Sequence, residues 1–523
     1  MLLQTKNYLD FQAGSHRFTG AKQAKSCLPG DEVEWTGEHC VLVKRAAHRF
    51  IPGVLETNSK YLYGHTTRGG KIFLFHPHDR KYPPFRVGSN CRDLTRNQLG
   101  LIEFMDWDDF ETMPRGNLLR ILGPCGDLKA EKDALMYEYS SPKLAKELFD
   151  IEDTDHKGRT PLQGFTFNID PDGCMDIDDV LTLNKVSDTE WEFVISISDV
   201  AAHILEGSEG DEHAFRLGET LYQNGDAVVP MLPPALSEMA LSLRPNETHV
   251  GMSLFCRWNS QTKHLTVGDF KETVFTNNFT YSYESVHDAK EFPLPILKDI
   301  AAFLHGSPTE DSHEWVAEAM LLYNKHVALK LLEHEVGLLR VHSLPDAERL
   351  KEFTAIHPDL QYMAYTAATY APAASGLIHA GLGSVPYCHA SSPIRRYADL
   401  VNQRHLKAIL KGTPLVPTPS SVAEHLNAIQ KKMRSYERSL FFLEQVSLVP
   451  TGTVEGLVLS STEEKTSLYI PTWKHVIRVD PGAYALGHHV SVEYYADLQK
   501  PHWDKRMVFR VTTDAIEDAV HSE

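Results

Sequence analysis

The sequence lacks the features of a membrane or secreted protein. No apolar run in its 523 residues approaches the ~20 residues that a membrane-spanning helix needs. The stretch MLLQTKNYLDFQAG has two leucines and then mainly polar residues, so we expect no secretory signal. The seven cysteines form no CxxC pair and are odd in number, which argues against a zinc ribbon or a disulfide framework. We therefore expect a cytoplasmic protein.

Basic residues are scarce relative to acidic ones. The chain has 52 Lys and Arg against 70 Asp and Glu, a formal net charge of −18. Because phosphate binding relies on Lys and Arg, a general nucleic-acid coat protein is disfavoured. A narrow basic channel inside an acidic shell stays open, since the local field matters more than the sum. The histidines show no HExxH or comparable metal-ligand spacing.

The length and the pattern of short apolar runs predict several domains. Runs such as KIFLFH, separated by turn residues, resemble the strands of small OB-type barrels. The fold class that we expect is a multi-domain protein with a mixed α/β domain flanked by β-barrels. The predicted parts are a partial barrel (1–48), a second barrel (49–125), a linker (126–160), the α/β domain (161–446) and a C-terminal barrel (447–523).

Four aromatic residues of the second predicted barrel fall at period-two spacing: Tyr61, Tyr63, Phe73 and Phe75. With Lys60, Arg68 and Lys71 nearby, they could form a face on which single-stranded bases stack. They could equally be the barrel core on alternate positions.

The stretch NIDPDGCMDIDDV (168–180) gathers five aspartates, whose like charges repel. An EF-hand does not fit, because a loop starting at Asp170 would have Met175 where Gly is needed and Leu181 where Glu is needed. A solvated acidic loop is the usual alternative, but apolar FTFNI and VLTL frame the cluster. The remaining interpretation is a site for hard metal ions such as Mg²⁺, which prefer carboxylate oxygens. Two Mg²⁺ ions bound there could promote displacement at a phosphoryl group.

Distant aspartates can share such a site only if the chain reverses. Asp170 and Asp179 would be ~30 Å apart in an extended chain. Pro171, Asp172 and Gly173 are turn residues and predict that reversal.

A second stretch, PYCHASSPIRRYADL, offers cations for phosphates. We expect Pro393 in the first turn of a helix, capped by Ser391 or Ser392, with Arg395 and Arg396 at its N-terminal end. The alternative is a surface helix start whose arginines pair with acids such as Asp399.

Together, these stretches resemble the RNase II/RNase R family, whose members carry an RNB catalytic domain. Asp170, Asp176, Asp178 and Asp179 match its aspartate quartet, and HASSPIRRYADL resembles its HFTSPIRRYADL. VISISDVAAHI, VPMLPPALSEMALSLRPNE and IHAGLG also match in order. The N-terminal and C-terminal β regions lie where cold-shock and S1 domains lie in RNase R and the exosome catalytic subunit.

The resemblance implies a 3′→5′ exoribonuclease that hydrolyses single-stranded RNA to nucleoside 5′-monophosphates in RNA degradation or processing. It implies Mg²⁺, with Mn²⁺ as an alternative ion, and single-stranded RNA as the partner. No membrane partner is expected, no protein partner is indicated, and a monomer is expected.

The resemblance also assigns roles to residues. Asp170, Asp176 and Asp179 would hold metal, while Asp178 and Arg395 would be catalytic. The implied substrate contacts are Tyr222, Tyr283, Glu318, Arg396 and His389.

The sequence departs from the family pattern in two places that affect function. VAEAM has Ala317 in place of one of two family glutamates. The stretch from Tyr283 to Glu318 lacks a helix-turn element that carries an aromatic base clamp in bacterial members. Two competing hypotheses follow: a catalytically weakened RNA-binding regulator, and a nuclease that cuts internally or acts on DNA.

Overall fold

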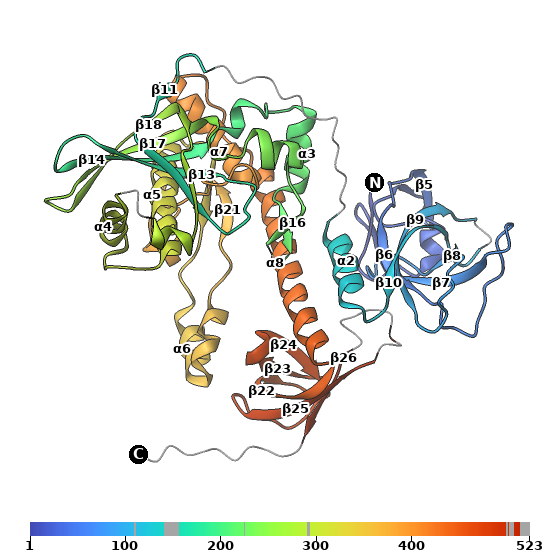
Figure 1. Ribbon diagram of the computed structural model, residues 1–523. Helices are drawn as coiled ribbons and strands as arrows, with labels where there is room; N and C mark the ends of the chain where they lie inside the picture. Colours follow the sequence, from blue (N-terminus) through green and yellow to red (C-terminus); the bar gives the residue numbers. More distant parts are fainter. Residues whose placement is uncertain are drawn as a thin grey trace, which may run out of the picture. The chain divides into compact units, whose positions relative to one another are not determined.

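The computed structural model describes residues 1–108, 111–140, 156–223, 225–289, 293–497, 500 and 507–512 (Figure 1). The chain divides into two compact units, Met1–Pro142 with Lys432–Glu523, and Lys143–Lys431. Helix α8 (Ser420–Leu448) begins in the unit Lys143–Lys431 and ends in the unit that contains Lys432–Glu523. No helix in the described ranges combines the length and apolarity that crossing a bilayer requires.

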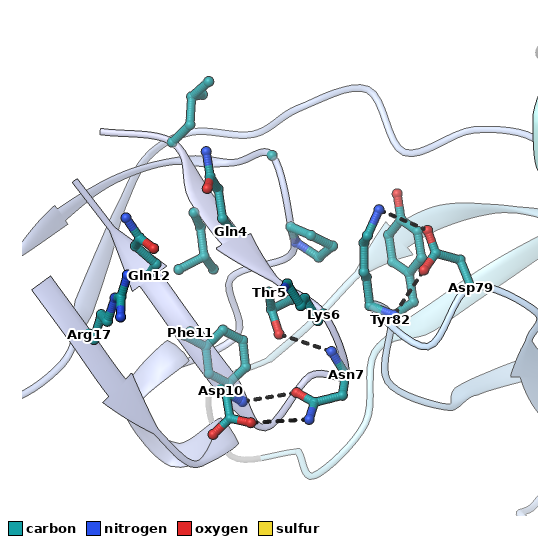
Figure 2. A pocket seen from close by; sticks show the side chains of 15 residues that line it. Gln4, Thr5, Lys6, Asn7, Asp10, Phe11, Gln12, Arg17, Asp79 and Tyr82 are labelled. Carbon is teal, nitrogen blue, oxygen red and sulfur yellow. Dashed lines mark hydrogen bonds and ion pairs between the residues drawn. The ribbon is translucent and has the colours of Figure 1, made fainter. Parts of the chain in front are cut away.

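The first 44 residues form a small β module. Strands β1 (Leu3–Thr5), β2 (Asp10–Ala13) and β3 (His16–Thr19) make an antiparallel meander, and helix α1 (Ala21–Ala24) leads to the hairpin of β4 (Glu32–Trp35) and β5 (Cys40–Lys44). The N–H of Leu3 donates to the carbonyl of Asp31 (2.8 Å), so the segment entering β4 lies along β1. A cavity of about 850 Å³ opens against β1 and β2, with Tyr82 from a later turn at its edge (Figure 2).

Five longer strands close into a barrel in the order β10-β8-β7-β6-β9. They are β6 (Ile51–Leu55), β7 (Lys71–Pro77), β8 (Phe85–Ser89), β9 (Gln98–Asp106) and β10 (Arg115–Pro124). Helix α2 (Leu128–Tyr139) follows, capped by the Asp127 carboxylate, which accepts from the N–H of Ala130. Part of the predicted linker, 141–155, lies outside the described residues.

The four aromatic residues at period-two spacing separate into two pairs. Phe73 and Phe75 lie on β7 and are 3% and 0% exposed, so they belong to the barrel core. Tyr61 and Tyr63 lie before β7 begins and are 79% and 38% exposed. The period-two spacing therefore marks core positions only within β7. Tyr61 and Tyr63 remain available for stacking on single-stranded bases.

The second unit is built on a seven-stranded sheet, in the order β11-β18-β17-β14-β13-β12-β19. Its strands are β11 (Thr160–Pro161), β12 (Phe165–Asp170), β13 (Asp179–Lys185), β14 (Glu190–Ser198), β17 (Thr248–Asn259), β18 (His264–Thr276) and β19 (Phe279–Ser282). Helices α4 (Leu294–His305) and α5 (Ser312–Glu333) pack on this sheet (Figure 1). Trp315 and Tyr323 of α5 are buried in one core with Phe193 and Trp258 of the sheet.

The other strands and α-helices of this unit, with one π-helical turn, lie outside the large sheet. They are α3 (Glu209–Leu217), the hairpin of β15 (Leu221–Gln223) and β16 (Asp226–Val229), a π-helical turn (Ala235–Ala240), the pair β20 (Leu338–Val341) and β21 (Thr369–Pro372), α6 (Ala347–Ile356) and α7 (Tyr397–Lys411).

A last sheet follows α8 in the order β24-β23-β22-β25-β26. Its strands are β22 (Thr451–Ser461), β23 (Thr466–Ile470), β24 (His475–Val479), β25 (His489–Ala496) and β26 (Met507–Thr512). Residues 513–523 of the predicted C-terminal barrel lie outside the described residues. The expected fold class, a mixed α/β domain with flanking OB-type β modules, is confirmed.

Candidate active site

A cavity of about 650 Å³ in the second unit brings together the four quartet aspartates. Asp170, Asp176, Asp178 and Asp179 all line it. Tyr222, Tyr283 and Arg395 line the same cavity, although the chain brings them from three other segments. Of the ten residues to which we assigned roles, the structure therefore gathers these seven around one space.

The chain reversal predicted from Pro171 to Gly173 is what gathers the aspartates. The N–H of Cys174 donates to the carbonyl of Pro171 (3.1 Å), and Gly173 has φ +78°, a conformation that glycine adopts without strain. In the antiparallel β12–β13 pair, Phe167 stands opposite Leu181. Beyond this pairing Asp170 and Asp179 both line the cavity, and the charge of Asp170 contributes to raising the pKa of Asp179.

The parallel pairing of β12 with β19 brings Tyr283 to the cavity. Asp170, the last residue of β12, stands opposite Ser282, the last residue of β19. Tyr283 is the next residue along the chain and therefore emerges beside the aspartates. Burial raises its pKa to about 12, with Asp170 and Asp179 adding to the shift.

Asp178 is held by two donors from the segment that carries the arginines. Its Oδ2 accepts from Nε of Arg395 (2.9 Å), and its Oδ1 accepts from the N–H of Ile394 (3.1 Å). The Asp178 side chain is only 3% exposed. Burial raises its pKa to about 7, which outweighs the opposing effect of Arg395 and of the Ile394 N–H.

The other aspartates repel each other in a buried setting. Burial raises the pKa of Asp170, and it raises that of Asp179 well above the usual value, with Asp170 and Asp178 contributing to the second shift. The carboxylate of Asp170 accepts from the Nδ2 of Asn168 (2.9 Å), and that of Asp176 accepts from the hydroxyl of Tyr222. These neutral donors orient carboxylates without cancelling their charge.

The charge around the cavity is strongly negative. Its lining residues include seven carboxylates and the guanidinium of Arg395 as the one Lys or Arg side chain; the carboxylates are Asp170, Asp172, Asp176, Asp178, Asp179, Asp226 and Glu238. A phosphodiester could not approach this surface without further positive charge.

Divalent cations fit this site by donor chemistry and by charge. Carboxylate oxygens are the ligands that Mg²⁺ and Mn²⁺ prefer. No group of three or more His, Cys, Asp or Glu side chains that could hold a metal ion exists among the residues that the structure describes.

The helix after the arginine motif begins later than predicted. Helix α7 starts at Tyr397 with Arg396 as its N-cap residue, so Pro393 is not in its first turn and neither serine caps it. The segment is instead tied to a neighbouring stretch, because the N–H of Thr220 donates to the carbonyl of Arg395 (2.9 Å) and that of Tyr397 donates to the carbonyl of Gly218 (2.8 Å). Long-range backbone pairing thus overrides the local helix-start pattern.

The structure does not bring three predicted substrate contacts to the cavity lining. Arg396 donates to Asp399 (2.8 Å), the pairing that we gave as the alternative for these arginines. His389 is partly buried, and its Nδ1 lies 2.8 Å from the hydroxyl oxygen of Tyr370. Glu318 pairs with Nδ1 of His305 (3.1 Å), between α5 and α4.

Besides Asp172, which we expected only as a turn residue, two further carboxylates of the lining had no predicted role. Asp226 lies on β16, and Glu238 lies in the π-helical turn after VPMLPPAL. Only the motif match over that stretch could have pointed to Glu238, since a single acidic residue has no spacing of its own. Asp199, at the end of β14, is fully buried and bonded to Arg159 (2.7 Å) and Lys407, outside the cavity.

Family models match two parts of the chain. The RNB domain model matches residues 159–292 and 296–412, and the Dis3-like cold-shock domain 2 (CSD2) model matches residues 72–140. A probable exosome complex exonuclease RRP44 of Caenorhabditis elegans is 25% identical over 81% of this chain and 55% of its own. Ribonuclease R of Aquifex aeolicus is 24% identical over 68% of this chain and 60% of its own. The chain thus spans little more than half the length of these relatives.

Solved structures share the fold at low sequence identity. Mycoplasma genitalium RNase R in complex with ribose methylated single-stranded RNA matches with a TM-score of 0.72 and 16% identity, covering 98% of this chain and 100% of that one. Yeast Ssd1, described as a pseudonuclease, matches with a TM-score of 0.58 and 16% identity, covering 95% and 81%. With the aspartate quartet and SPIRRY in one site and the RNB and cold-shock models matched, the chain belongs to the RNB-domain family of RNase II and RNase R.

Proposed function

We propose that this chain is a 3′→5′ exoribonuclease that hydrolyses single-stranded RNA to nucleoside 5′-monophosphates, in RNA degradation or processing. The observation that carries the proposal is the convergence of Asp170, Asp176, Asp178, Asp179 and Arg395 on one cavity. The family membership and the exonuclease and ribonuclease activities for which the two relatives are named support it. The roles below rest on this proposal.

The carboxylates would bind the cations that the reaction needs. Asp170, Asp176 and Asp179 would hold Mg²⁺, or Mn²⁺ in its place. Bound there, the ions would neutralise the phosphate and favour attack by water on phosphorus. The hydroxyl of Tyr222 keeps one carboxylate oriented, because it donates to Asp176.

Asp178 and Arg395 would act as one unit. A guanidinium has five N–H donors in a rigid fork and stays charged, which suits a phosphate oxygen. Nε is committed to Asp178, and one Nη donates to the hydroxyl of Ser392 (3.2 Å). Arg395 therefore arrives at the cavity with its orientation fixed and with further N–H donors for a phosphate.

The two tyrosines would provide surfaces for the terminal nucleotides. Tyr222 and Tyr283 both line the cavity, and aromatic rings stack on unpaired bases and sugars of single-stranded RNA. A cytoplasmic location belongs to the same proposal and is supported by seven free thiols.

The alternative is an RNB-type protein that binds RNA and hydrolyses it weakly or not at all. The fold match to yeast Ssd1, a pseudonuclease, keeps this possibility in view. The presence of all four quartet aspartates favours the enzyme.

The test uses 5′-labelled single-stranded RNA with Mg²⁺, comparing the native chain with Asp178→Asn. The proposal expects a ladder that shortens from the 3′ end, is absent with EDTA, and is lost in the variant. Circular RNA and single-stranded DNA of the same sequence should persist; cleavage of the circle would identify an internal cutter. RNA binding by the native chain without any cleavage would establish the alternative.

A further inference from the structure

One aromatic side chain of the cavity is supported from behind by a histidine. The rings of Tyr283 and His313 lie nearly parallel, 11° apart, with their centroids separated by 3.8 Å. Tyr283 lines the cavity and His313 is not among the lining residues. His313 therefore touches the ring of Tyr283 without being part of the cavity surface.

The first turn of α5 fixes both residues of this pair. Asp311 caps the helix, and its Oδ1 accepts from the N–H of His313 (2.9 Å) and lies 3.0 Å from Nδ1 of the same residue. The intervening Ser312 donates through Oγ to the carbonyl of Tyr283 (2.7 Å). One helix start thus holds the backbone of Tyr283 and holds the imidazole that stacks on its ring.

This arrangement stands in the part of the chain where family members carry an additional base-clamp element. A tyrosine ring that swings freely loses rotamer entropy when a nucleotide stacks on it, and that loss weakens binding. A ring already held on one side presents its other side at lower entropic cost. His313 has 63% of its side chain exposed, so its contacts with Asp311 and Tyr283, and not burial, hold the imidazole in place.

We propose that His313 is a positioning residue for the 3′-terminal nucleotides of RNA: by stacking on Tyr283 it holds that ring ready to pack on the nucleotide in the aspartate-lined cavity. The proposal rests on the proposed function, because it assigns that cavity to RNA. It concerns the grip on substrate and not the chemical step.

The test is a double-mutant cycle on the full chain with 5′-labelled single-stranded RNA. His313→Ala and His313→Gln should raise KM about fivefold or more, the low end of what one base–aromatic stack contributes, with kcat changed less than about twofold. His313→Phe keeps a ring and loses the bond to Asp311, so it should restore KM. In the Tyr283→Ala background, His313→Ala should have almost no further effect.

His334→Ala provides the matched control. It removes another exposed histidine from the C-terminal end of the same helix, ~30 Å away along the helix axis, and should leave KM unchanged. A His313→Ala effect that persists undiminished in the Tyr283→Ala background, or that His313→Phe fails to restore, would mean a merely structural role and would overturn the inference.

A binding measurement separates this inference from the proposed function. The dissociation constant of 5′-fluorescein RNA with a free 3′ hydroxyl is measured in EDTA for the same variants. If the native chain binds RNA without cleaving it, the exoribonuclease proposal fails, and the cycle on binding still decides the role of His313. Equal affinities of the native chain and His313→Ala would refute that role even if the native chain is an active nuclease.

Discussion

Asp178 and Arg395 are 217 positions apart in the chain and share one hydrogen bond, from Nε to Oδ2 at 2.9 Å. The bond joins the start of β13 to the turn before α7. It makes the aspartate motif and the arginine motif into a single site. Each of the two stretches, taken alone, had an ordinary alternative: a solvated acidic loop, or a helix start with surface ion pairs.

The first prediction concerns this pair. Arg395→Lys should lower kcat for RNA hydrolysis roughly 100-fold, a loss comparable to that of one preorganised donor at a transition state, because an ammonium cannot bond Asp178 and a phosphate in the same fork. Arg395→Gln should also lower the free energy of unfolding by about 1–3 kcal/mol, since it leaves a buried carboxylate under-satisfied. Single-turnover kinetics and urea unfolding measure the two effects.

The matched control for the stability effect removes both charges. Asp178→Asn combined with Arg395→Gln should be more stable than Arg395→Gln alone, because the amide that replaces the buried carboxylate needs no countercharge. If the double variant is the less stable of the two, the pair does not act through charge burial.

A second prediction follows from the seven carboxylates around the cavity. In EDTA, Asp179→Asn should raise the melting temperature by about 2–4 °C, the effect of roughly 1 kcal/mol in a domain of this size, because it removes one buried repelling charge. The same variant should lose RNA hydrolysis. Asp179 would then lower the stability of the folded chain while being required for RNA hydrolysis, a trade-off common at functional sites.

Titration with metal ion completes this test. MgCl₂ or MnCl₂ should raise the melting temperature of the native chain, since a ligand that binds only the folded state stabilises it, and should do so much less in Asp179→Asn. NaCl at matched ionic strength serves as the control for non-specific screening. Identical shifts in the native chain and the variant would show that the ions bind elsewhere.

How far the sequence alone predicts this site depends on how local each feature is. The reversal that gathers Asp170 with Asp179 was predictable, because Pro171 and Gly173 encode a turn within a few residues. The start of α7 was not, because Arg395 and Tyr397 bond to residues near 218–220 instead of continuing a helix. A helix start predicted from neighbouring residues is therefore wrong where distant backbone groups hydrogen-bond to the same segment.

Individual side chains, too, were predictable where a local pattern decides their position and not where the tertiary structure decides it. Alternation predicted buried positions at Phe73 and Phe75 and could not tell that β7 begins only at Lys71. Glu318 was assigned to the substrate through a motif. In the structure Glu318 pairs with His305 of α4 and is not among the lining residues. No spacing in the sequence specifies whether a side chain of α5 reaches the cavity, and no residue of α5 is among its lining residues.

The third prediction concerns acid. Burial lowers the pKa of seven described histidines, namely His203, His213, His249, His379, His389, His405 and His475. A group with a folded pKa below its unfolded value of about 6.5 contributes stability above pH 6.5, and this stability is lost as the pH falls toward the folded value. The histidines should therefore lower the melting temperature between pH 7 and pH 5, whereas Asp178 and Asp179, whose pKa values burial raises, stabilise the folded state as they take up protons and oppose this drop.

One variant tests whether buried histidines cause this drop. His389, whose pKa burial lowers the most clearly, is a suitable site: His389→Gln keeps a polar partner for Tyr370 and cannot be protonated. The variant should show a shallower loss of stability with acid than the native chain. His334→Gln, at an exposed position, should keep the native slope; equal slopes in all three proteins would exclude His389 as a contributor.

The fourth prediction separates a binding role from a core role among the barrel aromatics. Tyr61 is 79% exposed and Phe75 is fully buried, although both belong to one alternating pattern. Tyr61→Ala should weaken binding of single-stranded RNA about fivefold or more, as loss of one stacking contact does, and leave the melting temperature unchanged. Phe75→Ala should lower the free energy of unfolding by about 3–5 kcal/mol, because it leaves a cavity in the barrel core. Fluorescence anisotropy in EDTA measures the first effect and thermal unfolding the second.

If Tyr61→Ala binds RNA as the native chain does, the exposed tyrosine of this loop takes no part in holding the substrate, and RNA affinity must come from other surfaces.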